Sequence, residues 1–544
     1  MAIIPSVLPS APLPILAPVV LIAVLLVLTR LYTTIRYRIS VKQVISATSG
    51  TQTPPAIPYT IPVLGNAREF LSHTPGAFWD TLFQRHPRET GACYLQLGGR
   101  TAAILYSGPA IQALFKSKAP RNRQANEAVI HSAFGVSLDE TRYYLTKDAQ
   151  AIEHKNFNEF LLKTEAVNEL SHQFMIHFQE ALFKKPGTPL EPVGLMDFLV
   201  PRMFHGSITA LLGKRIFEIY PDLCDKYWVF DADMMTCFYR IPKFLKPKVY
   251  AVRAELLDKM EEWQNAFEKE CDMSITGLND VKWDPAWGST INRARHLNYQ
   301  KLNLSMGARA SLDLGFIFGI SSNAIPMTGW VLLNLLNSLI DPLGDATLYD
   351  RVMAELDTAK LPNKQLDLPT LFALPLLQSI FHETLRMYMD ILVSREVDAD
   401  TILPLDEDGK KMIRVKKGDI LMVPTWASQH DESAWGKDVF NPERFLRIDP
   451  ETGKRVFSMS KDANGRYFPF GGGISICPGR VFAKQEVMVA VATVLLGFDI
   501  EVFGYLDANG RDSNRFPGLK KGYTGLGTVK NDGDLKVRFR ERVW

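Results

Sequence analysis

The chain has 544 residues, 46% of them hydrophobic, with 62 Lys and Arg residues against 59 Asp and Glu residues. This composition supports a large buried core and excludes a disordered chain, and the balanced charge gives no indication of a nucleic-acid partner. The five cysteines form no CxxC pair and have no regular spacing, which argues against a disulfide framework or a zinc site and favours reduced thiols.

The N-terminal region contains an uncharged apolar run from Ala11 to Thr29, close to the ~20 residues that cross a bilayer. No basic residue precedes this run, whereas four follow it, namely Arg30, Arg36, Arg38 and Lys42. A cleavable signal peptide, the alternative, would have a basic start and a shorter apolar core. The pattern therefore predicts an uncleaved membrane anchor over residues 1–30, with the rest of the chain on the cytoplasmic side.

Residues 31–65 are predicted to form a basic and proline-rich hinge, because five residues that disfavour a helix lie close together: Pro54, Pro55, Pro58, Pro62 and Gly65. From residue 66 onward apolar residues repeat at three and four, most clearly over 151–183, 248–273, 299–340, 345–360 and 369–388. Strand-like alternation is sparse, at 93–97, 102–106, 413–415, 420–423 and 535–539. The sequence therefore predicts one large domain over residues 66–544, mainly α with a minor β part.

The segment Phe468 to Arg480 reads FPFGGGISICPGR and is the most informative part of the chain. It lacks the Lys-Ser/Thr pair of a phosphate loop and the spacing of a dinucleotide fingerprint. Its glycines let the backbone approach a large planar group, and Pro478 suits the start of a helix. Cys477 is therefore predicted at a helix N-terminus, where the dipole lowers the pKa of its thiol and favours an iron-ligating thiolate. A buried structural cysteine is the alternative.

The pattern FxxGxxxCxGxxxA in this segment resembles the haem-binding signature of the cytochrome P-450 superfamily, and its fixed positions are Phe470, Gly473, Cys477, Gly479 and Ala483. The resemblance implies the mostly α fold of that superfamily. It also implies that Cys477 is the axial ligand of haem b and that Phe470, Gly473 and Gly479 belong to the haem-binding loop. The superfamily usually has Arg or His two positions before the cysteine, where this chain has Ser475.

A second motif, ExxR, is formed by Glu383 and Arg386, and Arg444 follows later in NPERF. The pair alone would more often be a surface salt bridge worth ~0–1 kcal/mol. Together the three residues resemble the superfamily's Glu-Arg-Arg network. The resemblance implies a structural role, in which a buried carboxylate between two guanidiniums holds the loop that carries the cysteine.

Two basic residues are predicted to bind the haem propionates. Arg395 matches the place beyond ExxR where the superfamily often has such an arginine. The superfamily's WxxxR motif is missing, and the segment EHKNFNEF at 153–160 is its counterpart, with Lys155 as the candidate ligand. Ordinary surface positions are the alternative for both.

A long helix from about Asn298 to Leu339 is predicted to cross the haem face. The superfamily normally has an acid and a threonine there, which relay protons to oxygen. In the segment FGISSNAIPMTGW of this chain, Ser322 takes the place of the acid and Asn323 that of the alcohol. A register shifted by one would place Asn323 and Ala324 there instead.

The pattern Asn-x-x-Pro and the loop SICPGR resemble the branch that includes sterol 7α-hydroxylases and prostacyclin synthase. Pro326 removes a helical hydrogen bond near Ser322, which predicts a groove for water, oxygen or a substrate oxygen. A kinked core helix in which Asn323 finds a backbone partner is the alternative.

The resemblance implies a membrane-bound haem-thiolate monooxygenase that inserts one atom of O2 into a bulky hydrophobic molecule such as a steroid or terpenoid. No flavin or dinucleotide motif is recognisable, so the electrons are expected from NADPH-cytochrome P-450 reductase, with cytochrome b5 as a further donor. The expected location is the endoplasmic reticulum membrane, single-pass, with a cytoplasmic catalytic domain. The N-terminus and cysteine loop resemble those of fungal secondary metabolism.

Two other functions remain open at this point. The first is an isomerase or radical-coupling enzyme of the same fold without net oxygenation, which Asn323 favours and which would not depend on NADPH. The second is a non-catalytic membrane haem protein whose proton relay is incomplete. The intact cysteine loop and ExxR motif argue against the second.

Overall fold

The computed structural model describes residues 13–71, 74–117, 123–183, 191–272, 282–342, 344–436, 438–459, 463–522 and 525–542. The chain divides into two compact units, and the predicted domain over residues 66–544 contributes to both. The first unit consists of Met1–Ser72, Ala77–Pro120 and Ser394–Pro424. The second consists of His73–Gly76, Arg121–Val393 and Thr425–Trp544.

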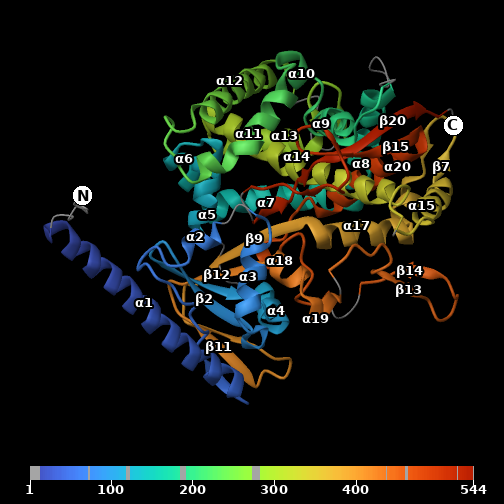
Figure 1. Ribbon diagram of the computed structural model, residues 1–544. Helices are drawn as coiled ribbons and strands as arrows, with labels where there is room; N and C mark the ends of the chain where they lie inside the picture. The colour runs from blue at the N-terminus through green and yellow to red at the C-terminus, as the bar shows by residue number, and fades with distance from the viewer. Residues whose placement is uncertain are drawn as a thin grey trace, which may run out of the picture. The chain divides into compact units, whose positions relative to one another are not determined.

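The first unit begins with the long helix α1, Leu13–Ser46 (Figure 1). Its part Ala17–Ser46 is long and apolar enough to cross a membrane, and none of its most apolar stretch is buried. The helix continues past residue 30, where the predicted anchor ends, because residues 31–46 contain neither proline nor glycine. The basic residues that follow the apolar run therefore belong to the same helix, and the predicted hinge is helical up to Ser46.

The rest of the first unit contains short strands and helices. The strands form two groups. In the first, β11 (Lys411–Val415) pairs with β1 (Gly50–Gln52) on one side and β10 (Thr401–Pro404) on the other. In the second, β3 (Arg100–Leu105) pairs with β2 (Ala92–Leu97) on one side and β12 (Ile420–Pro424) on the other. The β2–β3 and β10–β11 pairs are antiparallel, whereas β1–β11 and β3–β12 are parallel. The helices are α2 (Ala67–Phe70), α3 (Ala77–Arg85) and α4 (Gly108–Lys116).

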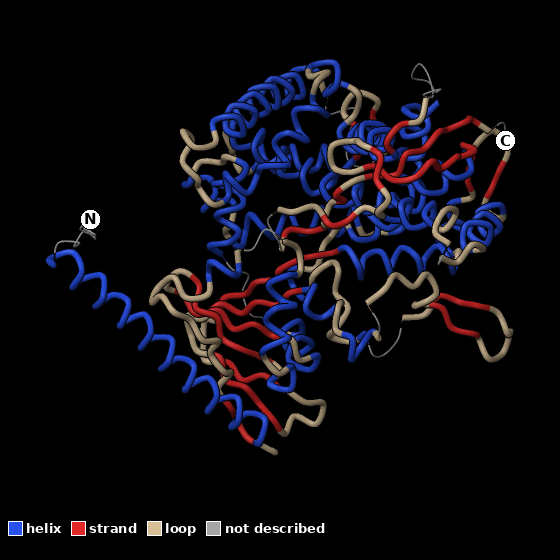
Figure 2. Tube along the Cα trace, in the orientation of Figure 1, coloured by secondary structure: helices blue, strands red, loops and turns tan. Residues whose placement is uncertain are grey.

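The second unit is mainly helical (Figure 2), and its helices before the cysteine loop are α5 (Arg123–Glu127), α6 (Leu138–Tyr144), α7 (Lys147–Leu161), α8 (Thr164–Phe183), α9 (Leu195–Leu212), α10 (Arg215–Ile219), α11 (Leu223–Phe238), α12 (Pro247–Glu270), α13 (Thr290–Lys301), α14 (Met306–Asn337), α15 (Leu348–Asp357), α16 (Leu368–Ala373), α17 (Pro375–Tyr388), α18 (Thr425–Gln429) and α19 (Glu432–Trp435). Helix α20, Arg480–Gly497, follows that loop. A π-helical turn, Ala128–Phe134, precedes α6.

Strands form a minor part of the second unit, as β4 (Val193–Gly194), β5 (Trp283–Asp284), β6 (Gly288–Ser289), β7 (Lys360–Leu361), β8 (Gln365–Leu366), β13 (Leu446–Ile448), β14 (Arg455–Phe457), β15 (Phe498–Leu506), β16 (Asp512–Ser513), β17 (Gly518–Leu519), β18 (Leu526–Thr528), β19 (Asn531–Asp532) and β20 (Asp534–Glu541). Strand β9, Met389–Glu396, begins in this unit, where it pairs antiparallel with β18. Strands β15 and β20 pair along most of their length. The prediction of a mainly α chain with a minor β part is confirmed.

The helix predicted over 298–339 is in fact two helices. Asn303 has a left-handed backbone (φ 50°), which ends the first helical segment, and the side chain of Ser305 then caps α14 by accepting a hydrogen bond from the backbone N–H of Ala308 (3.2 Å). Helix α14 continues through Pro326 to Asn337. Its length and apolar composition would also suit a membrane span, but most of it is buried in the core.

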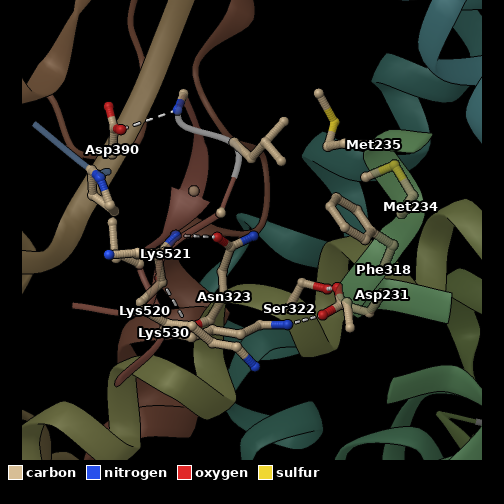
Figure 3. Close-up of a pocket in the computed structure, with 18 residues that line it drawn as sticks. Asp231, Met234, Met235, Phe318, Ser322, Asn323, Asp390, Lys520, Lys521 and Lys530 are labelled. Carbon is tan, nitrogen blue, oxygen red and sulfur yellow. Dashed lines mark hydrogen bonds and ion pairs between the residues drawn. The ribbon is translucent and has the colours of Figure 1, made fainter. Parts of the chain in front are cut away.

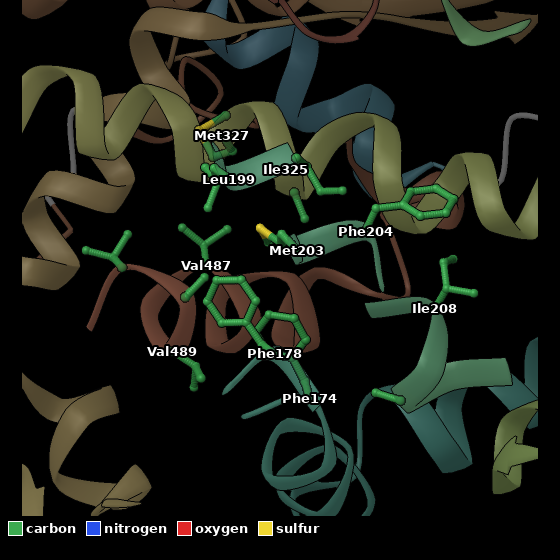
Figure 4. Packing of buried hydrophobic residues seen from close by; sticks show 14 of the residues in the cluster. Phe174, Phe178, Leu199, Met203, Phe204, Ile208, Ile325, Met327, Val487 and Val489 are labelled. Atoms are coloured by element: carbon green, nitrogen blue, oxygen red, sulfur yellow. The ribbon is translucent and has the colours of Figure 1, made fainter. Parts of the chain in front are cut away.

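The core of the second unit lies where α8, α9, α14 and α20 pack together (Figure 4). Phe174 and Phe178 of α8 stack with ring centroids 5.4 Å apart. Helix α9 approaches α8 closely at Gly206, where a Cβ atom would lie 2.9 Å from the Cα of Phe178. Burial of each such large side chain stabilises the fold by ~1.5–3 kcal/mol. This packing holds α14 and α20 in fixed positions, and both helices line one cavity of the second unit.

Candidate active site

A cavity of about 520 Å³ lies within the second unit. Its walls are mostly apolar and come from the π-helical turn, α7, α14, β9 and the segment around Cys477, with Phe134, Phe157, Phe316 and Met389 among the lining residues. Helix α14 presents one face to the cavity, because Gly315, Phe316, Gly319, Ile320, Asn323 and Ala324 recur at helical spacing. A Cβ atom at Gly319 would meet nothing within 4 Å, so α14 leaves open space there.

The segment around Cys477 is a tight loop held by its own backbone. The N–H of Cys477 donates to the carbonyl of Phe470 (2.9 Å), and the turn between them needs the left-handed conformations of Gly471 (φ 71°) and Gly473 (φ 59°). Phe470, Cys477, Gly479 and Ala483 line the cavity, whereas Gly473 shapes the turn and is not among the lining residues. The cysteine sulfur is thereby presented to the cavity on a loop of defined conformation.

The environment of Cys477 differs from the sequence prediction. Helix α20 begins at Arg480, so Pro478 precedes the helix and Cys477 lies three residues before it. Burial raises the pKa of the Cys477 thiol, and the N–H of Gly479 and the charge of Arg480 only partly oppose this rise. The groups near the start of α20 thus lower the pKa, but desolvation outweighs them, and the thiolate form of Cys477 stays a prediction.

Glu383 lies buried between two arginines. Its carboxylate accepts hydrogen bonds from Nε and Nη2 of Arg386 (2.8 and 2.9 Å) and from Nε of Arg444 (2.8 Å). The backbone N–H of Asn441 donates to the same carboxylate (3.0 Å). All three residues foreseen for this network are thus brought together, and the network joins α17 to the segment before β13.

Asp438 is a member of this network that the motifs did not indicate. It accepts from Nη1 of Arg386 (2.9 Å) and lies 2.6 Å from Nδ1 of His430. Burial opposes ionisation of Asp438, but His430 and Arg386 together hold the pKa of its carboxyl below the usual range. The sequence around Asp438 contains no motif that predicts this role, because the role depends on a contact with Arg386, which is distant in sequence.

Neither of the two predicted propionate ligands, Lys155 and Arg395, is among the residues that line the cavity. Lys155 is exposed on α7, whose residues at the cavity are Gln150, Glu153, Phe157 and Leu161 instead. Arg395 is buried near the end of β9, in the first unit, and its Nη1 donates to the carbonyl of Ser394 (2.9 Å).

Among the residues that the structure describes, the cation that lines the cavity is Arg295 of α13. It forms ion pairs with Asp313 (3.0 Å) and Glu153 (3.5 Å), and it donates to the carbonyl of Leu312 (3.1 Å). Its partners belong to α7 and α14, which are far apart in sequence. No local sequence pattern therefore predicts that Arg295 lies at the cavity.

Ser322 and Asn323 have different surroundings although they are adjacent. Ser322 donates to Asp231 Oδ1 of α11 (2.5 Å), is hydrogen-bonded to Tyr227, and lines a smaller cavity of about 140 Å³. Asn323 lines both cavities, and Ala324 lines the larger one. The residues of this segment that face the larger cavity are therefore Asn323 and Ala324, which corresponds to the shifted register.

The carboxamide of Asn323 is fixed by β18. Its Oδ1 accepts from the backbone N–H of Thr528 (2.9 Å), and the hydroxyl of Thr528 donates to the backbone carbonyl of Asn323 (3.1 Å). A Cβ atom at Gly527 would overlap with this Oδ1. Because the oxygen faces Thr528, the Nδ2 group points the other way (Figure 3), and among the described residues it has no acceptor.

Glu486 of α20 is a further cavity residue that the sequence did not indicate. It is buried, and the hydroxyl of Ser207 donates to its Oε1 (2.5 Å). Burial raises the pKa of the Glu486 carboxyl to about 8, against a smaller lowering by the Ser207 hydrogen bond. The carboxyl is therefore largely neutral at pH 7.

The sequence of this chain is similar to those of known proteins. The family model described as Cytochrome P450 matches residues 328–508, which include the ExxR and cysteine segments. Cytochrome P450 monooxygenase calL of Penicillium decumbens is 31% identical over 401 residues, which cover 72% of either chain. Cytochrome P450 monooxygenase efuG of Hormonema carpetanum is 27% identical over 96% of either chain. Prostacyclin synthase of Rattus norvegicus is 27% identical over 46% of this chain and 48% of its own. The chain belongs to the cytochrome P450 family.

Proposed function

We propose that this monooxygenase of the cytochrome P450 family binds haem b in the cavity of about 520 Å³, where Cys477 is the residue that would hold the haem iron. One observation carries the proposal: the Cys477 loop and the open face of α14 at Gly319 line the same apolar cavity. Cys477 presents its thiol on a tight loop, and Gly319 of α14 has no side chain to fill the cavity. This arrangement leaves room for a large planar group. Bound haem would supply oxygen activation assisted by the thiolate.

The protein holds this thiolate in place through two features. The N–H of Gly479 donates toward the sulfur, which favours its charged form against the cost of burial. The Glu383 network fixes the segment that precedes the loop by charge-assisted hydrogen bonds. Gly479 and the Glu383 network therefore position Cys477, the proposed iron ligand, and take no part in the reaction themselves.

The substrate is a bulky hydrophobic molecule, such as a steroid or terpenoid. Large apolar side chains line the cavity, including Phe134, Leu161, Leu312 and Phe316. Such walls exclude water and orient an apolar body by shape. The few polar groups at the cavity then decide which part of the substrate faces the reacting centre.

Asn323 is the polar residue best placed for this task. Its Oδ1 is engaged by Thr528, which leaves Nδ2 as a donor to an oxygen atom of the substrate. A carboxamide donates and accepts through separate atoms, so it passes a proton less readily than a threonine hydroxyl. Proton delivery at this site therefore uses water or a hydroxyl group of the substrate. Ser322 is already committed to Asp231.

Electrons come from NADPH-cytochrome P450 reductase, with cytochrome b5 as a further donor, and the enzyme resides in the endoplasmic reticulum membrane. Two observations support this assignment. Helix α1 is apolar and long enough to cross a membrane, and relatives over most of the chain are monooxygenases from Penicillium decumbens and Hormonema carpetanum. The cytoplasmic side is supported by the basic residues that follow the apolar run.

A rearrangement without net oxygenation is the second candidate, because Asn323 and not a threonine faces the cavity. Purified protein is incubated with reductase, NADPH and ¹⁸O2 against a panel of steroids and terpenoids. Incorporation of one labelled oxygen atom that requires NADPH supports the monooxygenase. Product formation from a peroxide substrate without NADPH supports the rearrangement.

The ligand assignment is tested by spectroscopy. Reduced protein treated with carbon monoxide should show the red-shifted band of thiolate-bound haem, and Cys477→His should lose it. Cys224→Ser of α11 is the matched control, since Cys224 does not line the cavity. A Cys477→His protein that keeps the band excludes Cys477 as the ligand.

A further inference from the structure

The smaller cavity lies beside the larger one and is lined by α11, α14 and the segment around β18. Asn323 and Leu526 line both cavities. These two side chains therefore form a boundary that the two cavities share, so a ligand of one cavity can extend toward the other. The chemistry of the smaller cavity thus bears on the shape and charge of the substrate.

The smaller cavity has an apolar and a polar side. Figure 3 shows Met234, Met235 and Phe318 on one side and three lysines, Lys520, Lys521 and Lys530, gathered on the other. The apolar side continues the character of the larger cavity. An occupant that spans both cavities is therefore amphipathic, with its polar end at the lysines.

One of the three lysines is already neutralised. Lys530 forms an ion pair with Asp231, a buried carboxylate that also accepts from Ser322. Both carboxylate oxygens of Asp231 are thus engaged by groups of the protein. This pair contributes no net charge for an occupant to meet.

The other two lysines carry unbalanced charge. Lys520 and Lys521 are exposed at the cavity, and neither has a carboxylate partner among the residues that the structure describes. The opposing group is Asp390, which is buried and accepts from the N–H of Gly525 (3.1 Å). Burial raises the pKa of Asp390 to about 6, which makes its negative charge easier to neutralise. With Asp390 ionised, two positive charges face one negative charge.

We propose that the substrate carries a carboxylate that lies in the smaller cavity against Lys520 and Lys521, while its apolar body extends into the larger cavity. The inference rests on the proposed monooxygenase function and adds the chemical class of the substrate. The Nδ2 group of Asn323, between the cavities, donates to a polar atom of the same molecule. A cationic end would be repelled by the two lysines, and an uncharged end would gain no Coulomb attraction from them.

The test uses probes that need no knowledge of the natural substrate. Alkanoic acids of increasing chain length carry a terminal imidazole, which binds haem iron and shifts its absorption, and the matching imidazolyl alcohols lack only the charge. Spectral dissociation constants are measured with the full-length protein. The acid should bind about tenfold more tightly than the alcohol at the chain length that spans both cavities, since two exposed charge pairs are involved. High salt should reduce this preference.

Lys520→Ala combined with Lys521→Ala should abolish the preference for the acid and leave the affinity for the alcohol unchanged. Lys536→Ala is the control, because Lys536 pairs with Asp512 and lines neither cavity. Equal binding of acid and alcohol to the unmodified protein, or a preference that survives in the double variant, overturns the carboxylate assignment alone. Absence of any spectral response to both probes overturns the proposed haem cavity and the inference with it.

Discussion

Asn323 of α14 accepts a hydrogen bond through its Oδ1 from the backbone N–H of Thr528 in β18, at 2.9 Å. The contact joins the helix that faces Cys477 across the cavity to the C-terminal strands. It also orients the amide so that Nδ2 is the group left to donate. The side chain of Asn323, predicted from the sequence as part of a proton relay, is therefore held in one orientation by β18.

Asn323→Ala should lower the product formed per NADPH several-fold and increase peroxide release, because it removes both the donor and the link to Thr528. Loss of one buried hydrogen bond should cost about 1 kcal/mol of stability and leave haem content nearly unchanged. Thr528→Val is the matched control, since it keeps the backbone N–H that binds Oδ1. Unchanged coupling in Asn323→Ala would remove Asn323 from the mechanism.

Glu383→Ala should be among the most damaging substitutions in the chain. It leaves the guanidiniums of Arg386 and Arg444 without their shared carboxylate, and breaking a buried pair in this way costs about 3–5 kcal/mol. Urea unfolding and haem content after purification measure the effect. Glu443→Ala, at a more exposed ion pair with Arg351, should cost only ~0–1 kcal/mol. Equal stability of the two variants would show that the network is not structural.

The stability of the protein should depend on pH through Glu486. Its folded-state pKa of about 8 lies above the unfolded value, so between pH ~4.5 and ~8 the folded state holds a proton that the unfolded state has released. Stability therefore falls as the pH rises through this window, by at most about 1.4 kcal/mol per unit, and levels off above it.

Glu486→Gln keeps an oxygen that accepts from Ser207 and removes the titration. The difference in unfolding free energy between the variant and the unmodified protein should thus grow in favour of the variant from pH 5 to ~8. Urea denaturation at several pH values provides the comparison. A difference that stays constant across this range would mean that Glu486 does not titrate within it.

Removal of residues 1–30 should release the protein from membranes with its haem spectrum intact. The most apolar part of α1 is not buried against the rest of the chain, so its loss leaves the core unchanged. Membrane fractionation and the carbon monoxide spectrum measure the two outcomes. An unrelated uncharged apolar segment in place of residues 17–29 serves as the control and should restore membrane binding. Loss of haem on truncation would show that the segment supports the fold.

Several features could be predicted from the sequence because they depend on residues at short, fixed spacing. The apolar run of α1, the helical periodicity and the pattern around Cys477 are of this kind, and the mainly α fold and the family are confirmed. The ExxR motif indicated the contact between Glu383 and Arg386, since residues three apart share a helical face.

Other features were decided only by tertiary structure. Ser322 and Asn323 are adjacent in sequence, yet packing of α11 on one side and β18 on the other gives them separate partners, Asp231 and Thr528. Arg295 reaches the cavity because α7, α13 and α14 meet there, whereas Lys155 stays at the surface. The pKa of Cys477 depends on burial in the folded chain, which outweighs the lowering by Gly479 and Arg480. Local pattern thus determined the elements and the cysteine loop, while long-range packing decided which polar side chains face the cavity and how they ionise.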